Sequence, residues 1–151
     1  MSSQQTTGEK INYYDSDGNI KAALFSDEAK ALAESFYKKD DRGRPTKDTP
    51  KNSQVRKFYN EVLNLQNSIN LEIGSDNSDA KKNAALNKWL PFVRMLAAKV
   101  DYSKSREKVN VPFEQFIKKH TASIKTYKDF ETFVKFFEAV IAYSTGILPK
   151  G

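Results

Sequence analysis

Apolar residues recur at α-helical spacing through most of the chain, and this pattern predicts an all-α protein, a compact bundle of about five helices. Local signals place the helix boundaries. Ser26 and Thr49 are expected N-caps, with Pro50 as the first residue of the second helix. The stretch from Gly74 to Ser78 is expected to end that helix and to cap the next one, which Pro91 should kink, and Thr126 is expected to cap the fifth helix. The predicted helices cover about residues 26–38, 50–72, 79–103, 110–124 and 126–143.

The third predicted helix has two unlike faces. One arc is apolar and is expected to face the core, and a basic face that includes one aromatic side chain lies opposite. The apolar arc consists of Leu86, Trp89, Leu90, Val93, Leu96, Ala97 and Val100. The basic face consists of Lys88, Met95, Lys99, Tyr102 and Arg106. Arg106 belongs to this face only if the last helical turn persists beyond the predicted end.

The fifth predicted helix is apolar over roughly half of its circumference, which is wider than the ~100° stripe of a surface helix. It is therefore either the central helix of the core or a contact between subunits.

The segments outside the helices differ in character. Residues 1–25 lack helical periodicity and are expected to be flexible or hairpin-like around the turn-rich residues 15–19. Residues 40–50 contain Gly43 and two prolines, which favour a mobile basic loop without regular structure. The expected organisation is a single helical domain over residues 26–146, followed by a C-terminal tail at 147–151.

Composition narrows the class of protein. A chain of 151 residues with 38% hydrophobic residues is long enough for one self-sufficient core. The absence of Cys excludes disulfides and thiolate chemistry and suits a reducing cytoplasm. No leader pattern or membrane-length apolar run is visible in the sequence. We therefore expect a cytoplasmic protein that is neither secreted nor embedded in a membrane.

The formal charge of +6 is divided into blocks. Residues 38–57 carry a net +5 and residues 81–108 a net +6, whereas residues 1–37 and 58–80 are acidic. Blocked positive charge is typical of a protein that binds polyanions, although a solvated lysine-rich face has the same composition.

Catalytic and metal-binding patterns are missing from the sequence. The one histidine, His120, lies at helical spacing with Phe116, Ile117 and Ile124, which favours a position at the edge of the core over a catalytic role. No zinc-binding, phosphate-loop or nucleophile-elbow motif is present. We expect no enzymatic activity, no cofactor and no metal.

Three stretches of the chain together resemble a known family. They are residues 56–62, residues 90–102 with Arg106, and residues 133–143. Their order, spacing and helical setting are similar to those of the small subunit of the type III-A CRISPR (Csm) effector complex, over about residues 50–145. The resemblance implies an antiviral-defence protein present in several copies, stacked along guide RNA and target RNA. The large polymerase-like subunit and the backbone subunits would be its other partners, and the enzymatic activities would reside outside this chain.

The predicted RNA-binding residues lie in the stretches that resemble the family or on the basic face of the third predicted helix. They are Arg56, Lys57, Lys88, Arg94, Lys99, Tyr102 and Arg106. Each cation also has a simpler explanation as a solvated charge or as one partner of an ion pair, and Arg94 could pair with Asp101. Tyr102 could stack on RNA or brace the face.

Three other functions remain open from sequence. A helical adaptor would use the basic face for an acidic partner and the Phe-rich fifth helix as its anchor. A helix-turn-helix DNA-binding protein would use the short turn between the last two helices, but its recognition helix would present mainly phenyl rings. A hydrolase would need carboxylates from distant parts of the sequence to converge.

Overall fold

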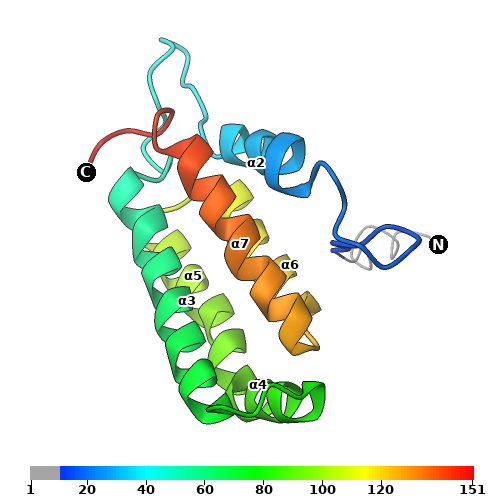
Figure 1. The fold of residues 1–151 in the computed structure, drawn as a ribbon. Coiled ribbons are helices and arrows are strands. Elements are labelled where there is room, and N and C mark those ends of the chain that lie inside the picture. The colour runs from blue at the N-terminus through cyan, green and yellow to red at the C-terminus, as the bar shows by residue number, and fades with distance from the viewer. Residues whose placement is uncertain (1–10) are drawn as a thin grey trace, which may run out of the picture.

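The computed structural model describes residues 11–151 and confirms the all-α prediction (Figure 1). The helical rods lie side by side, with α2 crossing one end of the bundle. The elements are the π-helical turn η1 (Leu24–Glu28) and the α-helices α2 (Ala29–Ser35), α3 (Asn52–Ile73), α4 (Asp79–Arg94), α5 (Leu96–Ser105), α6 (Val111–Ser123) and α7 (Tyr127–Ser144). No strand occurs among the described residues, and the part of the N-terminal prediction that concerns residues 1–10 lies outside them.

The first helix begins earlier and ends earlier than predicted. Ser26 is not an N-cap, because it lies inside η1, where the N–H of Glu28 donates to the Ala23 carbonyl over five residues. Leu24 is buried and η1 packs against α7, so tertiary burial has overridden the local capping signal. At the other end, Phe36 lies just past α2, and its carbonyl accepts a 2.9 Å hydrogen bond from the Asn110 side chain.

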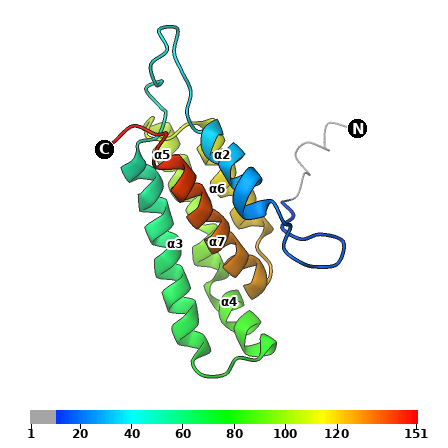
Figure 2. The same cartoon turned by 45° about the horizontal axis from the view of Figure 1, so that its top comes forward.

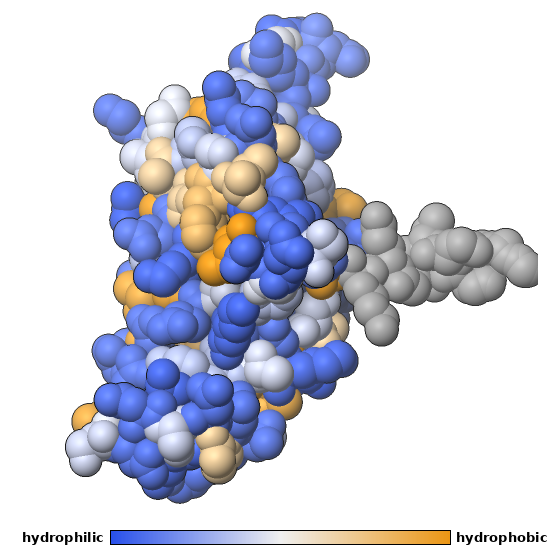
Figure 3. Space-filling model, turned by 45° about the vertical axis from the view of Figure 1, so that its right-hand side comes forward, coloured by the Kyte–Doolittle hydropathy of each residue, from blue (hydrophilic) through white to orange (hydrophobic). Residues whose placement is uncertain are grey.

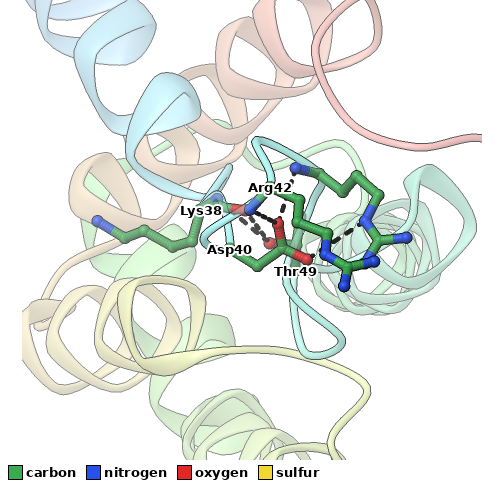
Figure 4. Close-up of polar contacts among 5 residues, drawn as sticks. Lys38, Asp40, Arg42 and Thr49 are labelled. Atoms are coloured by element: carbon green, nitrogen blue, oxygen red, sulfur yellow. Dashed lines mark hydrogen bonds and ion pairs between the residues drawn. The ribbon is translucent and has the colours of Figure 1, made fainter.

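The basic loop after α2 contains no helix or strand, as predicted, but hydrogen bonds close it into a hairpin. Lys39 and Pro45 form an isolated antiparallel bridge, and Asp40 closes the turn by accepting the backbone N–H groups of Arg42 and Arg44 (Figure 4). Gly43 supplies the positive φ of 77° that this turn requires. The hairpin projects beyond the end of the bundle at which α3 begins (Figures 1 and 2), and it is a hydrophilic protrusion in the space-filling view (Figure 3).

Thr49 was predicted to cap α3, but in the structure it closes the base of this hairpin instead. Its hydroxyl is buried, lies 2.7 Å from the Thr46 hydroxyl, and donates to the Lys38 carbonyl. Helix α3 starts three residues later at Asn52, with no side-chain cap. The Thr49 hydroxyl therefore bonds to Lys38, eleven residues away, instead of to an N–H group at the start of α3.

The C-terminal residues supply the missing cap of α3. The N–H of Asn52 donates to the Pro149 carbonyl at 2.9 Å, and the N–H of Ser53 donates to Gly151 O at 3.1 Å. Leu148 is buried against the core. The tail therefore satisfies two N–H groups that an α-helix cannot satisfy within its own first turn.

The third predicted helix is divided into α4 and α5. Ser78 caps α4 as predicted, by accepting the N–H of Lys81, and the helix continues through Pro91 to Arg94. The interruption falls at Met95, one turn later than the predicted kink. Pro91 is exposed, so the carbonyl that loses its N–H partner can be hydrated and the helix tolerates the proline.

Helix α7 is the central helix of the core, which resolves the two interpretations left open by its apolar width. It packs against η1, α2, α3 and α4. Its buried side chains are Phe130, Thr132, Phe133, Val134, Phe136, Phe137, Val140, Ile141 and Ser144. The side chain of Thr126 accepts the N–H of Asp129, whose carboxylate accepts the N–H of Thr126 in return.

His120 lies in this aromatic core, as its spacing predicted. Its ring stacks on Phe136 with centroids 5.2 Å apart, and its Nδ1 shares a 2.7 Å hydrogen bond with the Tyr13 hydroxyl. Burial is the main cause that lowers the pKa of His120, to about 3. The histidine is therefore neutral at physiological pH.

The segment that carries Tyr13 is hairpin-like, but only through one bridge between Tyr14 and Ile20. Asp15 accepts the N–H groups of Asp17 and Asn19, so the acidic residues form a plain turn. Tyr14 donates from its hydroxyl to Asp129 at 2.7 Å, which ties the turn to the start of α7. None of the described helices combines the length and apolarity that a bilayer crossing demands.

Replacing Leu148 with Ala should lower the free energy of unfolding by about 2–3 kcal/mol, because a buried leucine is lost where the tail caps α3. Leu71→Ala is the matched control, since Leu71 is 83% exposed, and it should change stability by no more than about 0.5 kcal/mol. Urea denaturation of both variants measures the difference. Equal effects would show that the tail does not support the fold.

Acidification should destabilise the protein through His120. Its native pKa lies below the ordinary 6.5, so between those values the unfolded state takes up a proton that the native state refuses. The contribution of His120 to stability is therefore complete above about pH 6.5 and falls as the pH falls. Between about pH 7 and pH 5, the wild type should lose about 2 kcal/mol more than His120→Gln in urea denaturation. Parallel pH profiles would contradict this assignment.

Candidate RNA interface

A groove of about 400 Å³ lies between α3 and α5. It exists because α3 packs closely along α4, whereas α5 packs mainly against α6 after the interruption at Met95. Its lining residues are Lys57, Phe58, Glu61, Met95, Ala98, Lys99, Tyr102 and Ser103. Three predicted RNA-binding residues, Lys57, Lys99 and Tyr102, are thus brought together from two helices and from both basic blocks of the sequence.

Two ion pairs span the antiparallel helices along this side of the molecule. Lys99 pairs with Glu61 at 2.6 Å, and Lys88 pairs with Glu72 at 3.0 Å. The two glutamates are eleven residues apart on α3, or roughly 16 Å along its axis, while Lys88 lies on α4 and Lys99 on α5. Lys88 therefore lies on the same side as the groove but beyond its lining.

The acidic partners Glu61 and Glu72 were missed at the sequence level. They lie in the acidic stretch 58–80, and no local pattern links that stretch to the basic face. Only the antiparallel register of α3 against α4 and α5 brings each carboxylate to its lysine. Pairs this exposed contribute little to stability, about 0–1 kcal/mol, so both lysines can exchange their partner for another anion.

Tyr102 and Arg106 form a unit at the end of the groove. Arg106 donates from Nη1 to the Tyr102 hydroxyl at 2.8 Å, and its guanidinium lies 5.6 Å from the centroid of the Tyr102 ring. Tyr102 is 61% exposed, so its ring is available on the surface. The last turn of α5 persists far enough for Arg106 to join the basic face, because the N–H of Arg106 still donates to the Tyr102 carbonyl.

Arg56 and Arg94 lie apart from the groove. Arg56 reaches Thr145 beside the end of α7, with Nη2 3.5 Å from the hydroxyl. Arg94 donates from Nε to the Thr121 carbonyl at 3.2 Å and from Nη2 to the Ile124 carbonyl at 2.9 Å. Arg94 is therefore a cap for the C-terminus of α6, where a cation is electrostatically favourable.

The suggested pairing of Arg94 with Asp101 is wrong. Asp101 pairs with Lys118 on α6, which also lies 3.4 Å from Glu114. The hydrogen bond from Lys118 is the main cause that lowers the pKa of Asp101. Residues 94 and 101 share a helical flank in sequence, but in the structure Arg94 at the end of α4 contacts the C-terminus of α6, and Asp101 on α5 contacts Lys118 of α6.

The structure also bears on the other functions. Among residues 11–151, no group of three His, Asp or Glu side chains is placed to hold a metal ion. The apolar side chains of α7 are buried in the core, so its phenyl rings are not free to anchor a partner, and its exposed positions include the charged residues Glu131, Lys135 and Glu138. The adaptor hypothesis therefore loses its hydrophobic anchor.

These features define the class: a small helical-bundle protein with one basic, aromatic-bearing groove. A family model described as Csm2 Type III-A matches residues 21–145, and the chain belongs to this family. It is therefore a small subunit of the type III-A CRISPR effector complex. The match begins well before residue 50, so it also covers η1, α2 and the basic hairpin. No curated protein and no solved structure matches the chain significantly.

Arg94→Ala should destabilise the fold by about 1–2 kcal/mol, because two carbonyls at the end of α6 lose a charged donor. Arg56→Ala is the matched control, since its one hydrogen bond is long and exposed, and it should be nearly neutral. Thermal and urea unfolding measure both effects. If the two variants are equally stable, Arg94 is not a cap.

Proposed function

We propose that this protein is a non-catalytic RNA-binding subunit that stacks along the guide RNA–target RNA duplex and contacts its backbone through the groove face. We define the groove face as Lys57, Lys88, Lys99, Tyr102 and Arg106. The observation that carries the proposal is the convergence of both basic blocks on one groove that also holds an exposed aromatic ring. Arg56 and Arg94 are left out because their guanidinium groups contact other parts of the chain.

The chemistry of the groove face suits a backbone contact. An A-form duplex presents phosphates and 2′-hydroxyls, while its base edges are largely hidden in a deep and narrow groove. Lysines with exchangeable surface partners bind phosphate without regard to sequence. A subunit that serves many different guides needs this kind of recognition, because base pairing supplies the specificity.

The membership in the effector complex supports the remaining parts of the proposal. Several copies would lie side by side along one RNA, next to the large polymerase-like subunit and the backbone subunits, in the cytoplasm. The chemical steps would then belong to other subunits. The groove face supplies cations and an aromatic ring, which bind and position RNA.

The variant Lys88→Gln/Lys99→Gln/Arg106→Gln should weaken RNA binding and reduce its salt dependence. Each lost phosphate contact should lower the slope of log K against log salt by roughly 0.7–0.9. The effect is reinforced because Glu61 and Glu72 are left without their lysines and repel phosphate. Fluorescence titration of labelled guide–target duplex at several salt concentrations measures both quantities.

The matched control neutralises three exposed lysines elsewhere, in Lys30→Gln/Lys125→Gln/Lys135→Gln. It changes the net charge by the same amount and should bind RNA more tightly than the groove-face variant. If both triple variants bind alike, net charge and not the groove face determines affinity. If the wild-type protein does not bind RNA at all, the proposed function is wrong.

A further inference from the structure

A second hollow, of about 220 Å³, lies where the base of the basic hairpin meets the turn between α5 and α6. Its lining includes four cations and one carboxylate. The lining residues are Lys47, Thr49, Lys51, Gln54, Arg106, Glu107 and Lys108. Lys47 and Lys51 come from the first basic block, and Arg106 and Lys108 come from the second. The two blocks therefore meet here in three dimensions, more densely than in the groove.

We propose that this hollow binds one phosphate group of an RNA chain. The proposal rests on the proposed function and deepens it by naming a phosphate subsite at the end of the groove face. Three of its cations, Lys47, Lys51 and Lys108, were not among the residues predicted from sequence. The ligand chemistry is a phosphate of RNA, either a backbone diester or a terminal monoester.

The hairpin holds Lys47 in place. Its neighbour Thr46 donates from its hydroxyl to Asp48 at 2.9 Å and also contacts the buried Thr49 hydroxyl. The N–H of Thr46 donates to the Lys38 carbonyl across the base of the hairpin. The backbone around Lys47 is therefore pre-organised, and less ordering is required when an anion binds.

The opposite wall is equally well anchored. The N–H of Lys108 donates to the Ser103 carbonyl at 2.9 Å. The next two residues, Val109 and Asn110, are buried, and the Asn110 side chain donates to the Phe36 carbonyl. Lys108 therefore extends from a turn that is fixed to both α5 and the end of α2.

The cations of the hollow have little competition. The one carboxylate in the lining, Glu107, lies 3.0 Å from Lys47 in a pair whose side chains are 84% and 59% exposed for Lys47 and Glu107. Such a surface pair exchanges readily for a phosphate. The N–H groups of Asn52 and Ser53 at the start of α3 are already taken by the C-terminal residues, so recognition would rest on the side-chain cations.

The hollow adjoins the groove through Arg106. This residue lines the hollow and donates to Tyr102, which lines the groove. An RNA strand in contact with Lys99 and Tyr102 can therefore continue into the hollow without leaving the protein surface. The groove and the hollow therefore form one continuous basic surface, built from two separate blocks of sequence.

The test uses Lys47→Gln/Lys108→Gln, which removes two cations of the hollow and leaves every groove-face residue unchanged. It should weaken RNA binding severalfold and lower the salt slope by about one phosphate contact, roughly 0.7–0.9. Lys30→Gln/Lys135→Gln is the control with the same net charge, and it should bind RNA more tightly than Lys47→Gln/Lys108→Gln. Glu107→Gln should act in the opposite direction and strengthen binding, because it removes the competing carboxylate.

RNA with and without a 5′-phosphate separates the two sources of the ligand. If the hollow binds a terminal monoester, removing the 5′-phosphate lowers the RNA affinity of the wild type but not that of Lys47→Gln/Lys108→Gln, and the two affinities become equal. If the hollow binds a backbone diester, the wild type binds more tightly than the variant whether or not the RNA carries a 5′-phosphate. Both results support a phosphate site.

Other outcomes overturn the inference. If Lys47→Gln/Lys108→Gln binds RNA like its control while the groove-face variant is weakened, the hollow is not a phosphate site and the proposed function still stands. If the variant loses binding to polyglutamate but not to RNA, the hollow binds an acidic protein instead. Equal midpoints of thermal unfolding for the wild type and the variant establish that a change in RNA affinity is not caused by misfolding. Absence of RNA binding by the wild type refutes the proposed function itself.

Discussion

The interruption of the helix at Met95 is the constraint on which the functional surface depends. Up to Arg94 the rod lies along α3, and beyond Met95 it continues as α5 against α6. Two helices that stayed in contact along their whole length would bury the residues between them. Because α5 turns toward α6, the side of α3 that carries Lys57 and Glu61 faces a groove. Arg94 supports this path by holding the end of α6 with two hydrogen bonds.

The aromatic core explains why the surface is left to polar residues. Helix α7 is surrounded by η1, α2, α3 and α4, and it contributes four buried phenylalanines, Phe130, Phe133, Phe136 and Phe137, to the interior. The exposed apolar residues that remain include Met95 and Tyr102, and both line the groove. The charged residues outside are therefore available for binding, and their positions follow from how the rods pack around α7.

Much of the fold could be predicted because helical periodicity reports burial directly. The apolar arc of residues 86–100 does face the core, and His120 lies among phenyl rings as its spacing indicated. Local capping signals were reliable where no distant group competed, as at Ser78 and Thr126. They failed at Ser26 and Thr49, where burial of Leu24 and the closure of a hairpin were stronger than a side-chain cap.

The sequence by itself determined that the chain is helical, that its charge is divided into blocks, and that Lys88, Lys99 and Tyr102 share one face of the third predicted helix. These are properties of single helices, set by residue spacing. Only the tertiary structure decided that Arg94 caps α6 and that Glu61 reaches Lys99. Only the tertiary structure brought residues 47 and 108 to one hollow. Such contacts depend on the register and divergence of different helices, which no local pattern encodes.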